Sequence, residues 1–341
     1  MKIKYINYIE PSNATGLITD IYTQMKRDFG RVVEPVALHS IIPELLAHNW
    51  SVLRETNVVE DKVKRNVKDA IATAVSKINK CPWCVDAHTI MLIGLSSPTV
   101  AKAIENENLS LIEDTKMRTI VEWALANRTP SAKIINNPPF TFDEAPEIIG
   151  TAIYYHYVNK MVSVLLNETP LPTKASSLKP FMKEIAALKF STALKRHKIP
   201  GESLKFIDSF NLDKDLFWAS ENKRIAVTFT AHKKIMEKLA EKHVPPEVQT
   251  IVIKTIEEWK GEDTGISRGW VEKYIPNLHE PLKPVARLSL LTAISPYQID
   301  DEIINSYKQF NPEDEALLST LSWASFVTAI RIGKWLGKPF A

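Results

Sequence analysis

The chain has 341 residues, of which 45% are hydrophobic and 24% are charged, so it can form one or two globular domains with a sizeable core. Only 10 residues are glycine, and no G-x-G-x-x-G or G-x-x-x-x-G-K-[ST] motif occurs, which argues against a phosphate-binding loop. The formal net charge is only +3, and basic clusters such as 62–65 lack interleaved aromatic residues, which argues against nucleic-acid binding.

Helical periodicity runs along the chain. Apolar residues such as Val67, Ile71, Ala74 and Ile78 recur at spacings of three and four, which places them on one face of a helix. Alternating patterns bounded by hairpin turns, which would indicate strands, are hard to find. The sequence therefore predicts an all-α fold, with helices in chain order over 45–53, 63–78, 83–95, 117–126, 148–166, 225–239 and 317–336.

A proline-rich segment divides the chain. Residues 169–180 contain Pro170, Pro172 and Pro180 and predict a linker between an N-terminal module, 1–168, and a C-terminal module, 181–341. Short echoes, such as Trp123 with Trp323, suggest an internal repeat. The matching positions lie closer together in the second half, and the missing residues fall where the cysteine segment would be. The second half would therefore have kept the helical scaffold and lost that segment.

The N-terminus lacks the apolar core of a signal peptide. The longest apolar stretch, 148–166, is interrupted by His156, Asn159 and Lys160, which favours a buried helix over a membrane span. We therefore expect a cytoplasmic protein that does not contact a membrane.

The cysteines are confined to one short segment. Cys81 and Cys84 are the only two in the chain, and a disulfide between them would close too small a loop to stabilise the fold strongly. A secreted disulfide scaffold would instead space several cysteines along the chain. Redox or metal chemistry is the better interpretation.

The segment 81–88 reads Cys-Pro-Trp-Cys-Val-Asp-Ala-His. Pro82 suits the first position of a helix, which places Cys81 at the N-cap, and Cys81, Cys84 and His88 then share one helix face. A helix N-terminus and a nearby histidine both lower a thiol pKa, so we expect Cys84 to be a reactive thiolate. His88 would accept its proton, and Cys81 could convert a sulfenic acid on Cys84 into a disulfide.

Two other interpretations of this segment remain open at this point. Cys81 and Cys84 could be buried structural residues beside an incidental histidine. With His88 and one carboxylate they could also bind zinc, although structural zinc sites usually join ligand pairs from separate segments and no second pair occurs. Asp86 lies about 200° from Cys84 around the helix and is expected to face solvent or to cap.

The segment resembles the AhpD-like alkylhydroperoxidase/carboxymuconolactone decarboxylase superfamily, whose peroxidase branch has an acidic residue, eleven further residues and then C-x-x-C-x-x-x-H. Asp69 stands at the acidic position, where the family usually has glutamate. The run 154–161 is similar to the helix that follows the family's core, with Lys160 in place of its arginine. The whole chain resembles the longer, two-module members with a degenerate second module, most clearly over residues 35–166.

The resemblance implies a mechanism. Cys84 would be the peroxidatic cysteine and Cys81 the resolving one, with His88 and Asp69 as a proton relay. Trp83 stands where the best-studied peroxidases have a histidine that belongs to the relay, so the proton path would differ here. The decarboxylase branch lacks the cysteine pair, which argues against lactone decarboxylation.

The implied activity is that of a thiol-dependent hydroperoxide reductase that uses neither a metal nor an organic cofactor. Its partners would be a hydroperoxide substrate and an external dithiol, lipoyl-linked or thioredoxin-like, and the family's helix packing implies a homo-oligomer. The alternatives are an oxidoreductase acting on protein or small-molecule disulfides and a non-catalytic redox-sensing or assembly protein.

Overall fold

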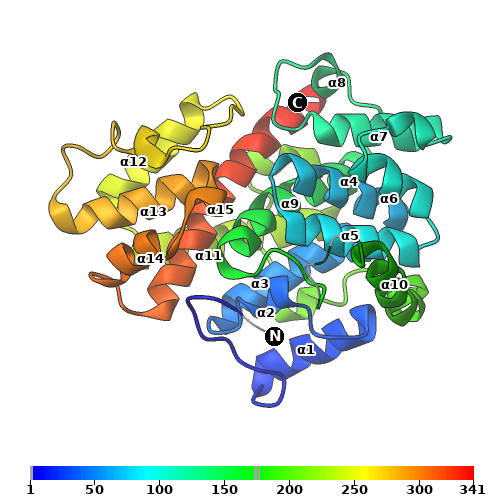
Figure 1. Cartoon of the computed structure of the whole chain (residues 1–341), viewed down its shortest axis with the longest axis horizontal. Helices are drawn as coiled ribbons and strands as arrows, with labels where there is room; N and C mark the ends of the chain where they lie inside the picture. The colour runs from blue at the N-terminus through cyan, green and yellow to red at the C-terminus, as the bar shows by residue number, and fades with distance from the viewer. Residues whose placement is uncertain (1–2, 173–174, 176) are drawn as a thin grey trace.

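The computed structural model describes residues 3–172, 175 and 177–341, and within these residues the regular structure is helical, with no strand. The predicted all-α class is therefore confirmed (Figure 1). The α-helices are α1 (Gly16–Phe29), α2 (Glu34–Ala37), α3 (Pro43–Leu53), α4 (Arg65–Ile78), α5 (Pro82–Gly94), α6 (Pro98–Glu105), α7 (Thr115–Leu125), α8 (Lys133–Asn136), α9 (Ala145–Leu165), α10 (Lys179–Lys195), α11 (Lys223–His243), α12 (Pro246–Glu258), α13 (Lys283–Ile294), α14 (Asp301–Lys308) and α15 (Asp314–Gly337).

Each of the seven predicted helices is present, and its observed ends lie within a few residues of the prediction. Capping residues account for some of these ends. Asp114 accepts a hydrogen bond from the amide of Met117 at the start of α7, and Asn222 accepts one from Ile225 at the start of α11. A π-helix, η1 (Arg54–Val58), extends α3.

Helix α9 lies at the centre of the molecule and is buried along almost its whole length (Figure 1). Helix α15 packs along it from the C-terminal half, and α4 packs on it from the N-terminal half. One continuous hydrophobic cluster contains residues of both halves. The module boundaries, 1–168 and 181–341 with the linker between them, stay a prediction.

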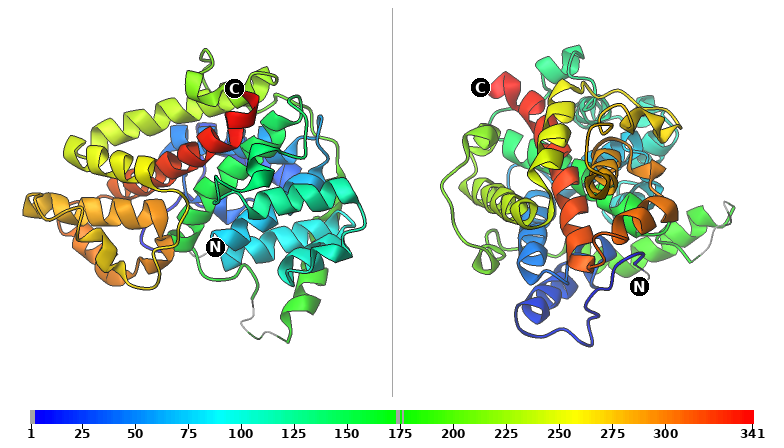
Figure 2. Two further views of the ribbon diagram at one scale, coloured as in Figure 1. Left: turned by 90° about the horizontal axis from the view of Figure 1, so that it is seen from above. Right: turned by 90° about the vertical axis from the view of Figure 1, so that its left-hand side faces the viewer.

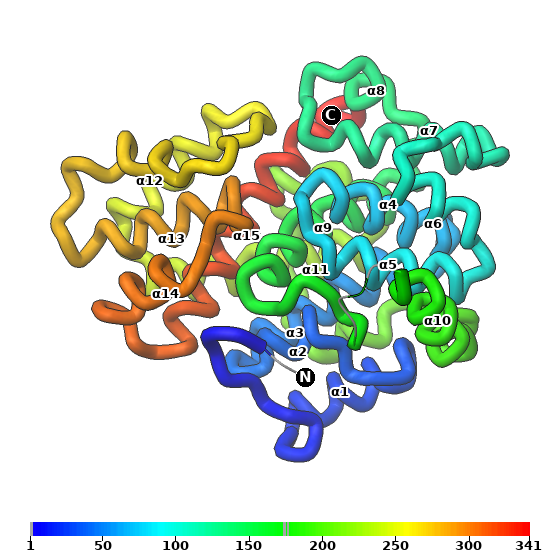
Figure 3. The backbone as a smooth tube through the Cα atoms, in the orientation of Figure 1, coloured from blue at the N-terminus to red at the C-terminus, as the bar shows by residue number. Residues whose placement is uncertain are grey.

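The N-terminal segment also contacts the C-terminal half. Tyr5 donates a hydrogen bond of 2.5 Å to Asp301, and the amide of Asn7 donates one of 2.8 Å to Asp314. In Figure 3 this segment accordingly runs beside α14. The two halves are thus joined at their ends as well as through α9.

The order of helices in the two halves fits the suggested repeat. In the first half α4 is followed by α5, the eight-residue α6 and then α7; in the second, α13 is followed by the eight-residue α14 and then α15. Between α13 and α14 lies only the three-residue helix η7 (Pro296–Gln298), where α5 would stand. A degenerate second module stays a prediction that this order supports.

Among the described residues, one stretch is long and apolar enough to cross a membrane by length and composition. It is 314–340, which contains α15, and 83% of its most apolar window is buried inside the structure. A buried, apolar helix is what a core position against α9 requires, so packing accounts for the composition of α15.

Helix α10 follows the linker and lies at the periphery of the molecule (Figure 2), packed against α5. The contact is close, since a Cβ on Gly94 would lie 2.9 Å from Leu194 and 3.3 Å from the backbone oxygen of Ala187. Helix α5, which carries both cysteines, is therefore enclosed between α4 on one side and α10 on the other.

Candidate active site

The cysteine segment begins α5 as its sequence predicts. Cys81 is the N-cap residue, Pro82 is the first helical residue, and Cys84 follows at the third position. The amide of Cys81 donates a hydrogen bond of 3.0 Å to the carbonyl of Ser76 in α4. Lys80 connects the helices with a φ of 55°, a left-handed conformation that is uncommon for a residue with a side chain.

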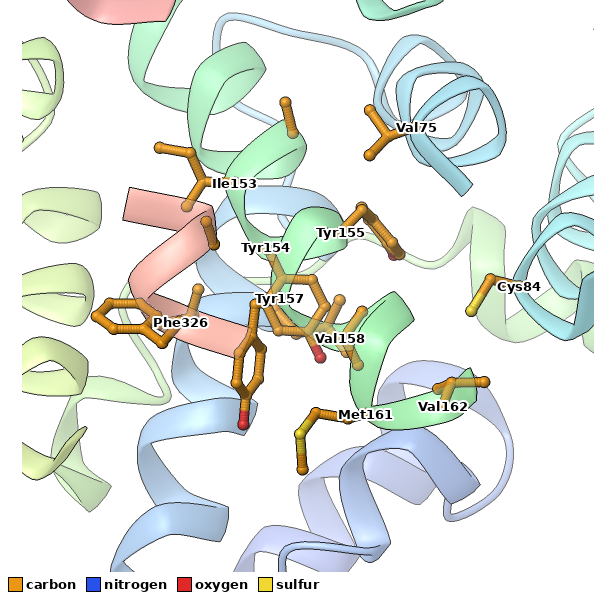
Figure 4. Close-up of a cluster of buried hydrophobic side chains, with 14 of the residues drawn as sticks. Val75, Cys84, Ile153, Tyr154, Tyr155, Tyr157, Val158, Met161, Val162 and Phe326 are labelled. Carbon is orange, nitrogen blue, oxygen red and sulfur yellow. The ribbon is translucent and has the colours of Figure 1, made fainter. Parts of the chain in front are cut away.

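The two thiols lie side by side and are buried. The Sγ atoms of Cys81 and Cys84 are 2.6 Å apart and share a hydrogen bond, and both are free cysteines. Their exposed fractions are 1% and 2%. Figure 4 shows Cys84 with its sulfur turned towards α9, near Tyr155. The pair is thus close enough for disulfide formation with only local movement.

The expected lowering of the Cys84 pKa is wrong for this arrangement. Burial raises the pKa of the Cys84 thiol well above its usual value, and its hydrogen bond with Cys81 and the charge that Cys81 would carry as a thiolate contribute further. The helix N-terminus is present, but burial removes the thiol from water, which disfavours its charged form. In the reduced protein Cys84 is therefore a protonated thiol that needs a base.

A buried polar network supplies a base next to the thiols. The Nδ1 atom of His88 lies 2.9 Å from Oδ1 of Asp69, so the structure joins the two residues of the predicted relay. The second oxygen, Oδ2, accepts a hydrogen bond of 2.6 Å from Nε of Arg65, one turn earlier in α4. Burial alone would raise the pKa of Asp69, but the charge of Arg65 and the hydrogen bond from His88 outweigh it, so the pKa falls below its usual value.

His88 and Cys84 border the same small cavity, of about 60 Å³. The cavity walls are mostly apolar and aromatic, and the ring of Tyr155 packs edge-on against His88 with the centroids 4.6 Å apart. Within the described part of the chain, no hydrogen bond joins His88 to Cys84. Proton transfer between them would need a side-chain movement or a bridging water.

Arg65 belongs to the network but was not among the predicted site residues. Its guanidinium is 2% exposed, stacks over Phe29 at 5.3 Å, and has two nitrogens, Nη1 and Nη2, without a hydrogen-bond partner. The usable signal in the sequence was an arginine four residues before an aspartate on one helix face.

Asp86 was expected to face solvent or to cap the helix, but it is buried, with only 6% of its surface exposed. It accepts a hydrogen bond of 2.8 Å from Thr169 and forms ion pairs with Lys179 and Lys183. The physical reason is α10, which covers this outer face of α5 and brings the two lysines with it. Asp86 therefore attaches the linker and α10 to the dithiol helix.

The remaining residues that the sequence singled out lie in the core. The predicted core tryptophans, Trp50, Trp123, Trp218 and Trp323, are all buried. His156 is buried as predicted, and its Nδ1 accepts a hydrogen bond from Asn79. Burial and the nearby charge of Arg128 lower the pKa of Lys160, the residue that stands for the family's arginine, to about 7.

The suggested zinc ligands do not form a group. Within residues 3–172, 175 and 177–341, no three histidine, cysteine, aspartate or glutamate side chains gather so as to hold a metal ion. The carboxylate of Asp69 instead binds His88 and Arg65, and that of Asp86 pairs with Lys179 and Lys183.

Comparison with known proteins places this site in a family. No family model matches the chain. An alkyl hydroperoxide reductase of Mycobacterium tuberculosis, Rv2159c, is 34% identical over 340 residues, which cover 98% of this chain and 96% of the relative. The chain belongs to the AhpD-like alkylhydroperoxidase superfamily. Because the alignment covers 98% of this chain, the similarity between this AhpD-like protein and the mycobacterial relative extends over both halves.

Proposed function

We propose that this AhpD-like protein is a thiol-dependent hydroperoxide reductase, an oxidoreductase in which Cys84 reacts with the peroxide. The observation that carries the proposal is the pair of buried thiols, 2.6 Å apart, beside a histidine that a buried carboxylate holds in place. The name of the mycobacterial relative, an alkyl hydroperoxide reductase, supports the same reaction class.

The hydrogen bond from Nδ1 of His88 to Asp69 determines the role of the imidazole. With Asp69 ionised, Nδ1 carries the proton and Nε2 is free to accept one. Nε2 would take the proton of the Cys84 thiol, whose raised pKa makes a base necessary. Asp69 would then stabilise the imidazolium, as the carboxylate does in a catalytic triad.

The reaction then proceeds in two steps. The Cys84 thiolate attacks the terminal oxygen of the hydroperoxide, the O–O bond breaks, and the departing alkoxide takes the proton from His88 to leave as an alcohol. Cys84 is now a sulfenic acid. The Cys81 thiol attacks its sulfur, the S–O bond breaks, and water leaves with the Cys81 proton. An external dithiol, lipoyl-linked or carried by a thioredoxin-like protein, would reduce the disulfide.

The surroundings of Cys84 favour an apolar hydroperoxide. The cavity at Cys84 is bordered by Phe29, Val36, Met91 and Val158, which offer no charge to a polar substrate. Trp83 and Ala87 also border a neighbouring cavity of about 270 Å³ under α10, which is open to a larger organic group. The organic group of an alkyl or aryl hydroperoxide would bind favourably here, because contact with these side chains removes its apolar surface from water.

The test is the consumption of cumene hydroperoxide by the reduced protein with excess dithiol. We expect turnover to be lost in Cys84→Ser and depressed in His88→Ala, whereas Cys81→Ser should oxidise once and accumulate a sulfenic acid that dimedone traps. Wild-type turnover no faster than that of Cys84→Ser would refute the proposal.

A second function is also consistent with two thiols that lie 2.6 Å apart, since such a pair can form and release a disulfide. Such a dithiol could instead exchange with protein or small-molecule disulfides. A wild-type protein that reacts rapidly with a disulfide but not with cumene hydroperoxide would support this alternative.

A homo-oligomer and a cytoplasmic location also stay predictions. Sedimentation equilibrium would test the first.

A further inference from the structure

Cys81 and Cys84 border different cavities although their sulfur atoms lie 2.6 Å apart. Cys84 borders the small apolar cavity that it shares with His88. Cys81 borders another cavity, of about 690 Å³. Trp83, the residue between Pro82 and Cys84, borders both and so forms part of the wall between them.

The cavity at Cys81 differs in chemistry from the cavity at Cys84. Its walls carry Lys4, Lys80, Ser163, Asn167 and Glu168, so it can hold a hydrated or polar group. Its volume is also about ten times larger. An apolar hydroperoxide would gain little from such walls, whereas a thiol on a polar carrier could approach Cys81 through them.

The C-terminal half provides one side of the larger cavity. Tyr297, in the short helix between α13 and α14, borders the cavity, and the Nζ atom of Lys80 lies 5.0 Å from its ring centroid. Lys80 also pairs with Asp263 at 2.9 Å. Tyr297 and Asp263 of the C-terminal half therefore hold Lys80, the residue with left-handed backbone conformation that immediately precedes Cys81.

We propose that this AhpD-like protein has two entrances, with the hydroperoxide reaching Cys84 through the apolar cavity and the reducing dithiol reaching Cys81 through the polar one. The proposal rests on the proposed function for the oxidant, and it assigns the polar cavity as the reductant site. The C-terminal half, which lacks a dithiol helix of its own, serves as a wall of that site.

The separation determines which sulfur the reductant attacks. The reductant thiolate forms a bond to Sγ of Cys81, the Cys81–Cys84 disulfide breaks, and Cys84 leaves as a thiolate that is protonated. The second thiol of the reductant then attacks the reductant sulfur that is bonded to Cys81. This bond breaks, and Cys81 is released. The reductant ends as a disulfide, and its two protons end on the two cysteines. In thiol–disulfide exchange, access decides which sulfur reacts, and here access differs for the two sulfurs.

Two matched variants, each adding a bulky side chain to one cavity, test the proposal. Asn167 is exposed and borders the polar cavity, whereas Ala87 borders the cavity at Cys84 and the neighbouring cavity under α10. Asn167→Trp should slow reduction of the disulfide by dihydrolipoamide about tenfold and leave oxidation by cumene hydroperoxide unchanged. Ala87→Phe should do the opposite, since a blocked approach costs on the order of tenfold or more in rate.

The two half-reactions are measured separately, each in a single turnover. For the reductive one, the disulfide is formed with diamide, so this measurement remains informative even if the protein does not react with peroxide. Circular dichroism and thermal unfolding establish that both variants fold. If Asn167→Trp slowed both half-reactions equally, or if Ala87→Phe alone slowed reduction by dihydrolipoamide, the separate reductant entrance would be disproved.

Discussion

The Nδ1 atom of His88 lies 2.9 Å from Oδ1 of Asp69, and this contact joins the dithiol helix α5 to the preceding helix α4. The carboxylate also receives a hydrogen bond from Arg65, so two donors fix its orientation. Asp69 is completely buried and yet has a lowered pKa, which means that the network retains a charge in the core. The imidazole of His88 is consequently held in one tautomer, with Nε2 as its basic atom.

Replacement of Asp69 by asparagine should remove this control of the imidazole. We expect Asp69→Asn to slow the oxidation of Cys84 by cumene hydroperoxide about 10²–10⁴-fold, because the amide neither stabilises the imidazolium nor selects the tautomer. The measurement is the single-turnover loss of free thiol. Asp69→Glu keeps the charge and should remain within about tenfold of wild type. An Asp69→Asn protein that reacts as fast as wild type would exclude the relay.

The contribution of Arg65 to the free energy of unfolding should depend on pH. In the wild type the pKa of Asp69 lies below its usual 3.8. The stabilisation from the Arg65–Asp69 ion pair is therefore present above pH 3.8 and is lost as the pH falls through the pKa of Asp69 in the folded protein. Arg65→Met leaves a buried carboxylate without its cation, which costs about 3–5 kcal/mol at neutral pH.

Urea unfolding at pH 7 and at pH 5 measures the effect. Without Arg65, burial would raise the pKa of Asp69, so the carboxyl of the variant becomes protonated at a higher pH than in the wild type. The deficit of Arg65→Met should therefore be larger at pH 7 than at pH 5. Arg65→Lys, which keeps a positive charge, should show a smaller deficit. A deficit that does not change with pH would mean that Arg65 acts by packing alone.

The Cys84 thiol should titrate above the physiological range in the reduced protein. Burial raises its pKa above the usual 9.0, and its contact with Cys81 contributes. The rate of alkylation by a small neutral reagent should therefore still be rising at pH 9, since only the thiolate reacts. Cys81→Ala should shift this profile to lower pH by removing the hydrogen bond between the thiols. A plateau below pH 8 in the wild type would contradict the effect of burial.

A local sequence pattern predicted the start of α5, because Pro82 suits the first position of a helix. Asp69 was predicted only through the resemblance to the AhpD-like family, and the structure joins its carboxylate to His88. The direction of the Cys84 pKa could not be predicted in this way, because it depends on burial by helices that are remote in the sequence. A periodic pattern shows that a face is apolar but not how completely another segment covers it.

The cavities and the burial of Asp86 could not be predicted from the sequence either, because both depend on packing between segments that are remote in the chain. The apolar cavity combines Phe29 of α1 with residues of α5 and α9, and Tyr297 from the C-terminal half borders the polar one. These segments are brought together by tertiary packing, for which the sequence has no short-range signal. The sequence predicted that Asp86 faces solvent or caps the helix. The periodicity of α5 alone does not show that α10 packs against it.

Gly261 should be necessary for the contact between the C-terminal half and the dithiol segment. Its φ is 97°, and an added Cβ would lie 1.7 Å from the backbone oxygen of Arg128, so even alanine requires the loop to move. The same loop carries Asp263, which pairs with Lys80 beside Cys81. We therefore expect Gly261→Ala to destabilise the protein and to release Lys80.

Gly265 provides the matched control, since its φ of 74° is also positive but no atom lies within 4 Å of an added Cβ. Gly265→Ala should cost only the backbone strain of a left-handed alanine, about 1–2 kcal/mol. Gly261→Ala should cost clearly more in urea unfolding, because strain and displacement of the loop add. It should also slow reduction of the disulfide by dihydrolipoamide more than oxidation by hydroperoxide, since only the polar cavity includes Lys80 and Tyr297. Equal costs for the two glycine variants would show that the loop moves freely and does not hold Lys80 in place.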